Sequence, residues 1–389
     1  MVLLGLGPWE KVTEAAQAKR VANSFRPLVQ WRRRTVVEAA PEPTDREASM
    51  PEPDPSHIMQ VGMGFFASKT LLSAVELGLF TELAKQPMTG AEIVRSLGLN
   101  HRAVPDFPDS LVALRFLERT GDGPDARYFN TPDSAMFLDR QSPGYIGGIL
   151  EMANARLYRF WSDLTEALKT GMPQNETKNS GEPMFAKLYE TPERLEQFMN
   201  AMSGVSAGNF KAFAKKFDFS KYKTLCDVGG ATGQLSCMVA AANPHVSCIS
   251  FDLPKVVPIA TRKIEQEGLA DRVAAAGGDF FVDPLPKADV ITMGMILHDW
   301  NLDKKKTLIR KAYDALPEGG AFVVIEALID DARRENAFGL LMSLNMLIEF
   351  GDAFDYSGSD FASWCREAGF RDFEIIPLTG PSSAAVAYK

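Results

Sequence analysis

The feature that most constrains this chain is a regular alternation of strand-length and helix-length segments that begins at Thr224. Four apolar runs of strand length follow one another: Thr224–Val228, Val246–Phe251, Asp289–Met293 and Ala321–Glu326. Segments typical of helices separate them: Leu235–Ala242, Val256–Glu267 and Lys304–Leu316. This alternation predicts an α/β domain whose mostly parallel sheet is covered by helices on both faces.

Three regions of different composition precede this domain, which we place at residues 218–389. Residues 1–49 are a basic and then Pro/Glu-rich extension, and Met50 is a candidate start of translation. Residues 50–142 combine apolar positions at helical spacing with a strand-like run near residues 127–131, which is typical of a winged-helix-like unit. Residues 143–217 are helical and rich in aromatic residues and Met, so we expect them to contribute to a pocket.

The overall charge bears on what the winged-helix-like unit does. Lys and Arg number 42 against 50 Asp and Glu, which gives a net charge of −8. Nucleic-acid affinity comes largely from neutralising phosphates, so this balance favours dimerisation over DNA binding for that unit. We expect neither a nucleic-acid partner nor a membrane partner.

The cysteines and histidines argue against a disulfide framework and a metal centre. The four Cys contain no Cys-x-x-Cys pair, which is typical of buried free thiols in a reducing cytoplasm. The four His are scattered along the chain, so no metal-ligand spacing is present. We therefore predict a cytoplasmic protein without a metal site.

A glycine-rich turn follows the first strand of the alternating region, at Asp227–Gly233. Glycines at a strand-to-helix turn let a ligand approach the backbone closely. The spacing differs from the Gly-x-Gly-x-x-Gly of dinucleotide dehydrogenases, because Ala231 and Gln234 occupy the later glycine positions. The turn thus favours a ligand other than a nicotinamide dinucleotide.

The next strand ends carry residues suited to a nucleoside and to proton transfer. Asp252 ends the second strand, where an acid can hold ribose hydroxyls, and Asp279 with Phe280 suits the edge and face of adenine. His298 follows the strand that ends at Met293, which makes it a candidate general base.

Taken together, these motifs resemble the S-adenosylmethionine-dependent small-molecule O-methyltransferases of the plant caffeate and bacterial hydroxyneurosporene type, over about residues 57–389. The family's Asp-Val-Gly-Gly-Gly-x-Gly corresponds to Asp227–Gly233, with Ala231 in place of the third glycine. Its His-Asp-Trp is unchanged at His298–Trp300. The resemblance implies a Rossmann-like methyltransferase sheet, an N-terminal winged-helix-like dimerisation domain, a homodimer and S-adenosylmethionine as cofactor.

The resemblance also implies roles for individual residues. His298 corresponds to the catalytic base, and Glu326 and Asp355 to two acids that flank it. Asp355-Tyr356-Ser357 stands where the family has Glu-Arg-Thr, and Gly294 replaces a lysine of the plant members. The implied cofactor-binding residues are Ser206, Gly229, Asp252, Asp279 and Phe280.

The acceptor is predicted from a narrower resemblance. Stretches such as Ala321–Asp331 and Glu349–Asp352 resemble bacterial enzymes of dimethylsulfoniopropionate synthesis, which predicts S-methylation of 4-methylthio-2-hydroxybutyrate. The first alternative is O-methylation of a phenolic or polyketide-like hydroxyl with His298 as base; a thioether has no proton to lose and needs none. The second alternative is a winged-helix regulator that senses S-adenosylmethionine. Its only support is the basic segment Lys11–Arg34.

Overall fold

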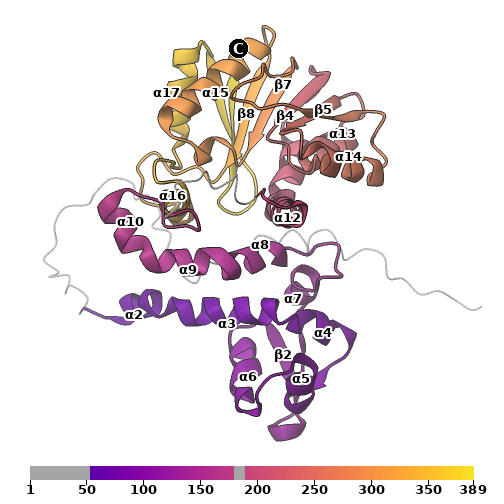
Figure 1. Cartoon of the computed structure of the whole chain (residues 1–389), viewed down its shortest axis with the longest axis vertical. Coiled ribbons are helices and arrows are strands. Elements are labelled where there is room, and N and C mark those ends of the chain that lie inside the picture. Colours follow the sequence, from indigo (N-terminus) through magenta and orange to yellow (C-terminus); the bar gives the residue numbers. More distant parts are fainter. Residues whose placement is uncertain (1–52, 179–188) are drawn as a thin grey trace, which may run out of the picture. The chain divides into compact units, whose positions relative to one another are not determined.

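The computed structural model describes residues 53–178 and 189–389 of the chain. The chain separates into two compact units, residues 1–59 and residues 60–389. The second unit holds a mainly helical N-terminal part and a large β-sheet (Figure 1). The predicted extension, with its basic segment Lys11–Arg34, lies outside the described residues.

The N-terminal part begins with helices that pack around a small antiparallel sheet. The helices are α3 (Gly64–Glu76), α4 (Leu79–Lys85), α5 (Gly90–Leu97) and α6 (Asp106–Ala113). The strands β1 (Met88–Thr89), β2 (Leu117–Thr120) and β3 (Arg127–Asn130) lie in the order β1-β3-β2. Thr89 and Glu92 form a capping box, since the Glu92 amide donates to Thr89 Oγ1 and the Thr89 amide donates to Glu92 Oε2. This pair fixes where α5 begins.

The stretch Ser56–Glu76, which contains α2 (Ser56–Gly62) and α3, is apolar and largely exposed. Among the described residues it is the one helical stretch long and apolar enough to cross a membrane, and 17% of its most apolar window is buried. Lys69 interrupts the stretch and donates a hydrogen bond to Asn154 Oδ1. Length and composition of a single such stretch are weak evidence for a membrane span, and exposed apolar surface of this kind also marks protein interfaces.

Short helical segments connect this part to the sheet domain. They are α7 (Pro132–Phe137), α8 (Gly147–Met152), the π-helical η3 (Ala153–Leu157), α9 (Tyr158–Phe160), η4 (Trp161–Asp163) and α10 (Leu164–Thr170). The long helix α12 (Pro192–Lys216) then leads into the first strand of the sheet domain. π-helical turns are rare and are often found at functional sites, which draws attention to η3.

The sheet domain contains seven strands in the order β6-β5-β4-β7-β8-β10-β9. The strands are β4 (Thr224–Val228), β5 (Ser247–Asp252), β6 (Val273–Gly277), β7 (Val290–Gly294), β8 (Ala321–Glu326), β9 (Asp372–Pro377) and β10 (Ser383–Tyr388). The first five are parallel, whereas β10 pairs antiparallel with both β8 and β9. The predicted α/β fold with a mostly parallel sheet is therefore confirmed.

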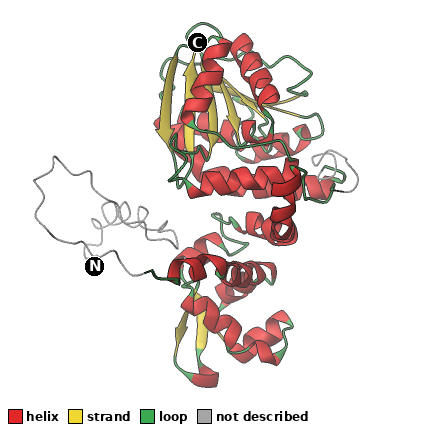
Figure 2. Ribbon diagram, turned by 90° about the vertical axis from the view of Figure 1, so that its left-hand side faces the viewer, coloured by secondary structure: helices red, strands yellow, loops and turns green. Residues whose placement is uncertain are grey.

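Helices cover both faces of this sheet, as Figures 1 and 2 show. They are α13 (Gln234–Ala242), α14 (Val257–Gln266), α15 (Leu302–Ala315), α16 (Ala337–Phe350) and α17 (Gly358–Ala368), together with the short η5 (Leu297–Asp299). Buried residues alternate between the faces along each strand: Val323 and Ile325 belong to one core, and Phe322 and Val324 belong to the other. This two-sided burial explains why the strands appear in the sequence as continuous apolar runs.

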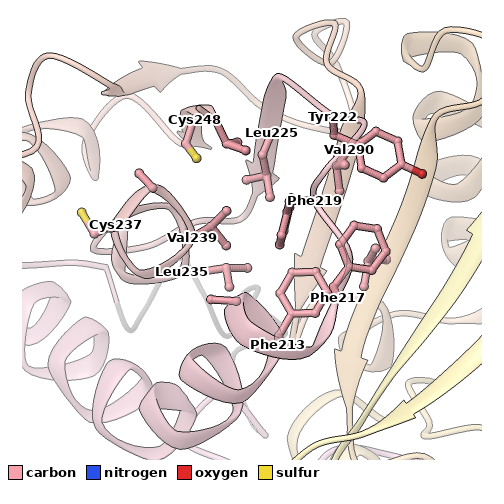
Figure 3. Packing of buried hydrophobic residues seen from close by; sticks show 14 of the residues in the cluster. Phe213, Phe217, Phe219, Tyr222, Leu225, Leu235, Cys237, Val239, Cys248 and Val290 are labelled. Atoms are coloured by element: carbon pink, nitrogen blue, oxygen red, sulfur yellow. The ribbon is translucent and has the colours of Figure 1, made fainter. Parts of the chain in front are cut away.

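The core that α12 and α13 share with the sheet is rich in aromatic rings (Figure 3). Phe217 stacks on Tyr222 with ring centroids 5.7 Å apart, and its edge contacts with Phe219 are 4.8 Å between centroids. Leu235 and Val239 of α13 pack in the same cluster. This packing fixes the end of α12 against the sheet and so positions the helix that carries Ser206.

Candidate active site

The chain order of the strands reverses at β4. From β4 the chain runs outward through β5 to β6 and then returns to β7 on the other side of β4. Ligands of open α/β sheets bind at such a reversal, beyond the carboxyl ends of the strands. The loops after β4, β5, β6 and β7 carry most of the predicted site residues, and all of them begin at this carboxyl edge of the sheet.

The loop after β4 adopts backbone conformations that favour glycine. Gly229, Ala231 and Gly233 have φ angles of 72°, 48° and 77°. A Cβ added at Gly229 would lie 2.3 Å from Ile296 Cδ1, so the loops after β4 and β7 are in close contact there. Ala231 adopts this left-handed conformation at a strain cost that a glycine would not have.

Asp252 links the β5 end to this loop. Its Oδ2 accepts a hydrogen bond from the Ala231 amide at 2.9 Å, and its Oδ1 accepts one from the Leu253 amide at 2.7 Å. Burial raises the pKa of the Asp252 carboxyl. Each carboxylate oxygen retains capacity for a further hydrogen bond, so the side chain is held in place and can still bind hydroxyl groups.

The remaining predicted cofactor residues lie in the loop after β6 and on α12, both of which contact the loop after β4. Phe280 Cε1 lies 3.9 Å from where a Cβ of Gly229 would be, which puts its ring beside the loop. Asp279 Oδ1 accepts from the Phe281 amide at 2.8 Å. Ser206 is buried on α12, and one turn earlier the Ser203 hydroxyl hydrogen-bonds the Thr232 hydroxyl at 2.7 Å. A carboxylate, an aromatic ring and a glycine cradle on adjacent loops fit a nucleoside.

His298 lies in η5, just after β7, among three carboxyl groups. Its Nε2 is 3.3 Å from Asp299 Oδ1, and its Nδ1 is 3.3 Å from Asp355 Oδ1. The Glu326 carboxylate accepts a hydrogen bond from the His298 backbone amide at 3.2 Å. The side chains of His298 and Asp355 are 5% and 2% exposed, so this cluster is almost free of bulk water.

These carboxyl groups control the charge of the imidazole. Burial alone would lower the pKa of His298, but the charges of Asp299 and Asp355 outweigh it and raise that pKa to about 10. The Glu326 charge acts in the same direction. Burial in turn raises the pKa of Asp299 to about 7 and also raises that of Glu326. Proton binding at these groups is therefore coupled, because a proton on His298 lowers the pKa of Asp299 and that of Glu326.

A lysine that the sequence reasoning missed completes the cluster. Lys305 of α15 is fully buried, and its Nζ donates a hydrogen bond to the Trp300 carbonyl. The ammonium also lies 3.9 Å from the centroid of the Phe354 ring. The signal was present in the sequence, because Lys305 shares helical spacing with three residues that are buried on the same face: Leu308, Ile309 and Ala312.

Helix α16 adjoins both η5 and the helical segment that contains η3. Asn345 Oδ1 accepts from Trp161 Nε1 at 2.9 Å, and Glu349 Oε2 accepts from Arg156 of η3 at 3.0 Å. Asn175 Nδ2 donates to the Glu349 carbonyl at 2.7 Å. These contacts hold α16 in place, and α16 also packs against the η5 segment that carries His298.

Family models match most of the described chain. An O-methyltransferase domain matches residues 161–371, and an O-methyltransferase dimerisation domain matches residues 59–140. Together with the fold and the site, these matches define a methyltransferase of small molecules. The chain belongs to the O-methyltransferase family.

The match to individual relatives extends over nearly their whole length. The chain is 39% identical to the tetracenomycin polyketide synthesis 8-O-methyl transferase TcmO of Streptomyces glaucescens, over 86% of this chain and 97% of that protein. It is 37% identical to the N,N-dimethyltransferase OxyT of Streptomyces rimosus, over 81% and 90%. The solved structure of human N-acetylserotonin methyltransferase in complex with S-adenosylmethionine matches with a TM-score of 0.80 and 29% identity, over 87% of this chain and 99% of that one.

These comparisons confirm the predicted family, fold, enzyme class and cofactor. The cofactor is S-adenosylmethionine. The prediction of S-methylation of 4-methylthio-2-hydroxybutyrate finds no support in them, and the alternative of O-methylation fits them better. The roles predicted for single site residues remain predictions.

Proposed function

We propose that this methyltransferase transfers a methyl group to a hydroxyl on a phenolic, polyketide-like small molecule. The observation that carries the proposal is the buried His298, whose two ring nitrogens each face a carboxylate at 3.3 Å. Such an environment stabilises a protonated imidazole, and therefore favours taking a proton from an acceptor. A hydroxyl acceptor must lose a proton, whereas a thioether has none to lose. The similarity to TcmO supports an acceptor of the polyketide type.

The cofactor would be held by the cradle after β4, β5 and β6. Asp252 would accept hydrogen bonds from the ribose hydroxyls, and Asp279 and Phe280 would contact the edge and face of adenine. The Gly229 turn would allow close approach of the backbone, and Ser206 would contact the cofactor from α12. When bound, S-adenosylmethionine supplies a methyl group on a positively charged sulfur, so the protein need not activate the methyl donor.

The residues around His298 have distinct roles in this proposal. His298 Nε2 takes the acceptor proton, and Asp355 beside Nδ1 orients the ring and stabilises its charge. Glu326 accepts a hydrogen bond from the His298 backbone amide, which fixes the backbone there, and it adds negative charge. The burial of the cluster excludes water, which strengthens each of these interactions.

A panel of acceptors tests the proposed function. Purified protein is incubated with labelled S-adenosylmethionine and with phenols, naphthols, polyketide-like phenols, aromatic amines and 4-methylthio-2-hydroxybutyrate, and methylated products are identified by mass. We expect methylation of phenolic hydroxyls. Methylation of the thioether alone would overturn the proposal.

N-methylation is a second candidate function. Its support is the 37% identity to an N,N-dimethyltransferase over 81% of this chain. An amine acceptor must also be deprotonated, so His298 would serve in the same way. The aromatic amines in the panel separate this candidate from O-methylation, because the mass spectra of the fragments locate the new methyl group on nitrogen or oxygen.

The rate should depend on pH through His298. The group with a pKa of about 10 must lose its proton to act as a base, so kcat/KM should rise as pH increases from 6 toward 10. Asp355→Asn removes a charge that holds the proton, and should move this limb to lower pH. The pH profile of kcat/KM is measured with two phenols of different pKa. A limb caused by ionisation of the phenol moves with the phenol pKa, whereas a limb caused by His298 stays at the same pH. A limb at or below the ordinary histidine pKa of about 6.5 would contradict the assignment.

The dimerisation-domain match and the exposed apolar face indicate a homodimer. Phe65 and Phe66 on α3 are 50% and 56% exposed, and several apolar neighbours on α2 and α3 are exposed with them. We infer that a second copy covers this face, and expect Phe65→Glu/Phe66→Glu to convert the dimer to a monomer in analytical ultracentrifugation. The control is Val282→Glu, which alters a side chain that is 78% exposed outside this face. A double variant that stays dimeric would exclude α3 from the interface.

A further inference from the structure

The loop between α16 and α17, residues 351–357, carries Asp355 and is anchored at that residue. The Asp355 backbone amide donates a hydrogen bond to Ser343 Oγ of α16 at 3.1 Å. The next carbonyl along the chain, that of Tyr356, accepts a hydrogen bond from the Ile329 amide at 2.9 Å. These two hydrogen bonds fix the backbone from which the Asp355 side chain extends.

A second anchor joins this loop to the segment that carries His298. Asn301 lies just beyond His298 in the sequence, and its Nδ2 donates a hydrogen bond to Asp352 Oδ2 at 2.8 Å. Its Oδ1 accepts from the Lys304 amide at 3.1 Å, so the same side chain caps the start of α15. The two segments are thus tied through Asn301 at one end, and His298 faces Asp355 at the other.

The position of the Asp355 carboxylate depends on these anchors, because little else holds the group. Its Oδ1 lies 3.3 Å from His298 Nδ1, whereas its Oδ2 is buried without a hydrogen-bond partner among the residues that the structure describes. Aspartate is also one methylene shorter than the glutamate of the family motif. A short side chain has little freedom to reach the ring on its own, so its carboxyl group follows the backbone closely.

We propose that Ser343 and Asn301 are positioning residues that hold the Asp355 carboxylate against the imidazole ring. The inference rests on the proposed roles of His298 and Asp355. Loss of an anchor would let the loop move away from the ring, and the imidazolium would lose part of its stabilisation. Ser343 and Asn301 are both uncharged, so their substitution changes the geometry around the ring without removing a charge.

The test follows the pH titration of the His298 imidazole in the protein without cofactor or acceptor. Four histidines give four imidazole signals in the NMR spectrum of histidine-labelled protein, and His298→Gln assigns the relevant one. The imidazole faces three carboxyl groups: Asp299 of η5, Glu326 of β8 and Asp355 of the loop. Ser343→Ala removes one anchor, and Asn301→Ser removes the other but retains the cap of α15. Because the Asp355 charge raises the pKa of His298, each variant should lower the midpoint by roughly half to one pH unit.

A double-substitution cycle separates positioning from a general loss of structure. Asp355→Asn alone should lower the midpoint, and in that background Ser343→Ala and Asn301→Ser should cause no further shift, because the carboxylate is already gone. Leu341→Ala is the control on α16, since this side chain is 51% exposed and should leave the midpoint unchanged. Wild-type midpoints in folded Ser343→Ala and Asn301→Ser proteins, or in Asp355→Asn, would overturn the proposal. A shift that persists in full in the Asp355→Asn background would also overturn it.

A pair of matched variants separates the hydroxyl of Ser343 from its packing. Ser343→Thr and Ser343→Val have nearly the same shape, but only Thr retains the hydroxyl that accepts the Asp355 amide. The Thr variant should therefore have the wild-type midpoint, and the Val variant should have the lowered one. Equal midpoints in the two would contradict the role of the hydroxyl. These NMR measurements require no turnover, so failure to find a phenolic acceptor would count against the proposed function alone.

Discussion

His298→Ala is expected to lower kcat with a phenolic acceptor by roughly 10²- to 10⁴-fold, the usual contribution of a positioned general base. The loss should depend on the acidity of the acceptor, because an already ionised phenol needs no base. A series of substituted phenols, compared in the wild type and the variant at one pH, should therefore show the largest loss for the least acidic member. A thioether acceptor, if it is methylated at all, should lose much less than the phenols.

Two measurements make this expectation specific to proton transfer. Affinity for S-adenosylhomocysteine, determined by calorimetry, should remain within about twofold of the wild type, because the cradle residues belong to other loops. His101→Ala, which alters an exposed histidine in the N-terminal part, should leave kcat unchanged. An equal loss for every phenol in the series would show that His298 acts by some means other than accepting a proton.

The sequence predicts the centre of the sheet well because those strands are buried on both faces. The strand bounds predicted at Thr224–Val228 and Ala321–Glu326 agree with β4 and β8. The outer strands gave a weaker signal. β6 consists mainly of Ala and Gly, and most residues of β9 are exposed at the edge of the sheet, so neither forms a continuous apolar run.

The predicted site residues were brought together because the carboxyl ends of parallel strands share one edge. Motif spacing therefore located the loops of Gly229, Asp252 and Asp279, and the segment of His298. Lys305 was missed because a lysine in a basic run, Lys304–Lys306, is normally taken as a solvated helix face. Helical spacing places the middle lysine on the apolar face of α15, but how deeply that face is buried depends on packing between distant elements.

The electrostatic behaviour of the site was also beyond the reach of the sequence. His298 and Asp299 are neighbours in the chain, but Asp355 approaches the ring from a segment 57 residues later, and Glu326 comes from β8. Whether these groups raise or lower the histidine pKa depends on burial and on distances of a few ångströms. The sequence could thus name a base, whereas its proton affinity required the assembled cluster.

Asp252→Ala is expected to weaken cofactor binding by roughly a hundredfold to ten-thousandfold. The carboxylate is held by the Ala231 and Leu253 amides, at 2.9 and 2.7 Å, with its remaining acceptor capacity available for the two ribose hydroxyls. Hydrogen bonds to a charged group contribute about 1.5–3 kcal/mol each, which gives this range when two are lost. Calorimetric titration with S-adenosylhomocysteine measures the effect without turnover.

The same substitution also deprives two backbone amides of their acceptor, so binding must be separated from loss of structure. Asp252→Asn retains the size and one acceptor oxygen, but turns an amino group toward one of the two amides, and should lose affinity to a smaller extent. Asp271→Ala removes a carboxylate that is 74% exposed and should bind normally. Asp252 ends β5, whereas His298 follows β7 on the other side of β4. The pH titration of the His298 imidazole, observed by NMR in histidine-labelled protein, should therefore be unchanged in Asp252→Ala when the sheet is intact. Wild-type affinity in that folded variant would show that the ribose is bound elsewhere, and the cradle proposed here would then be wrong.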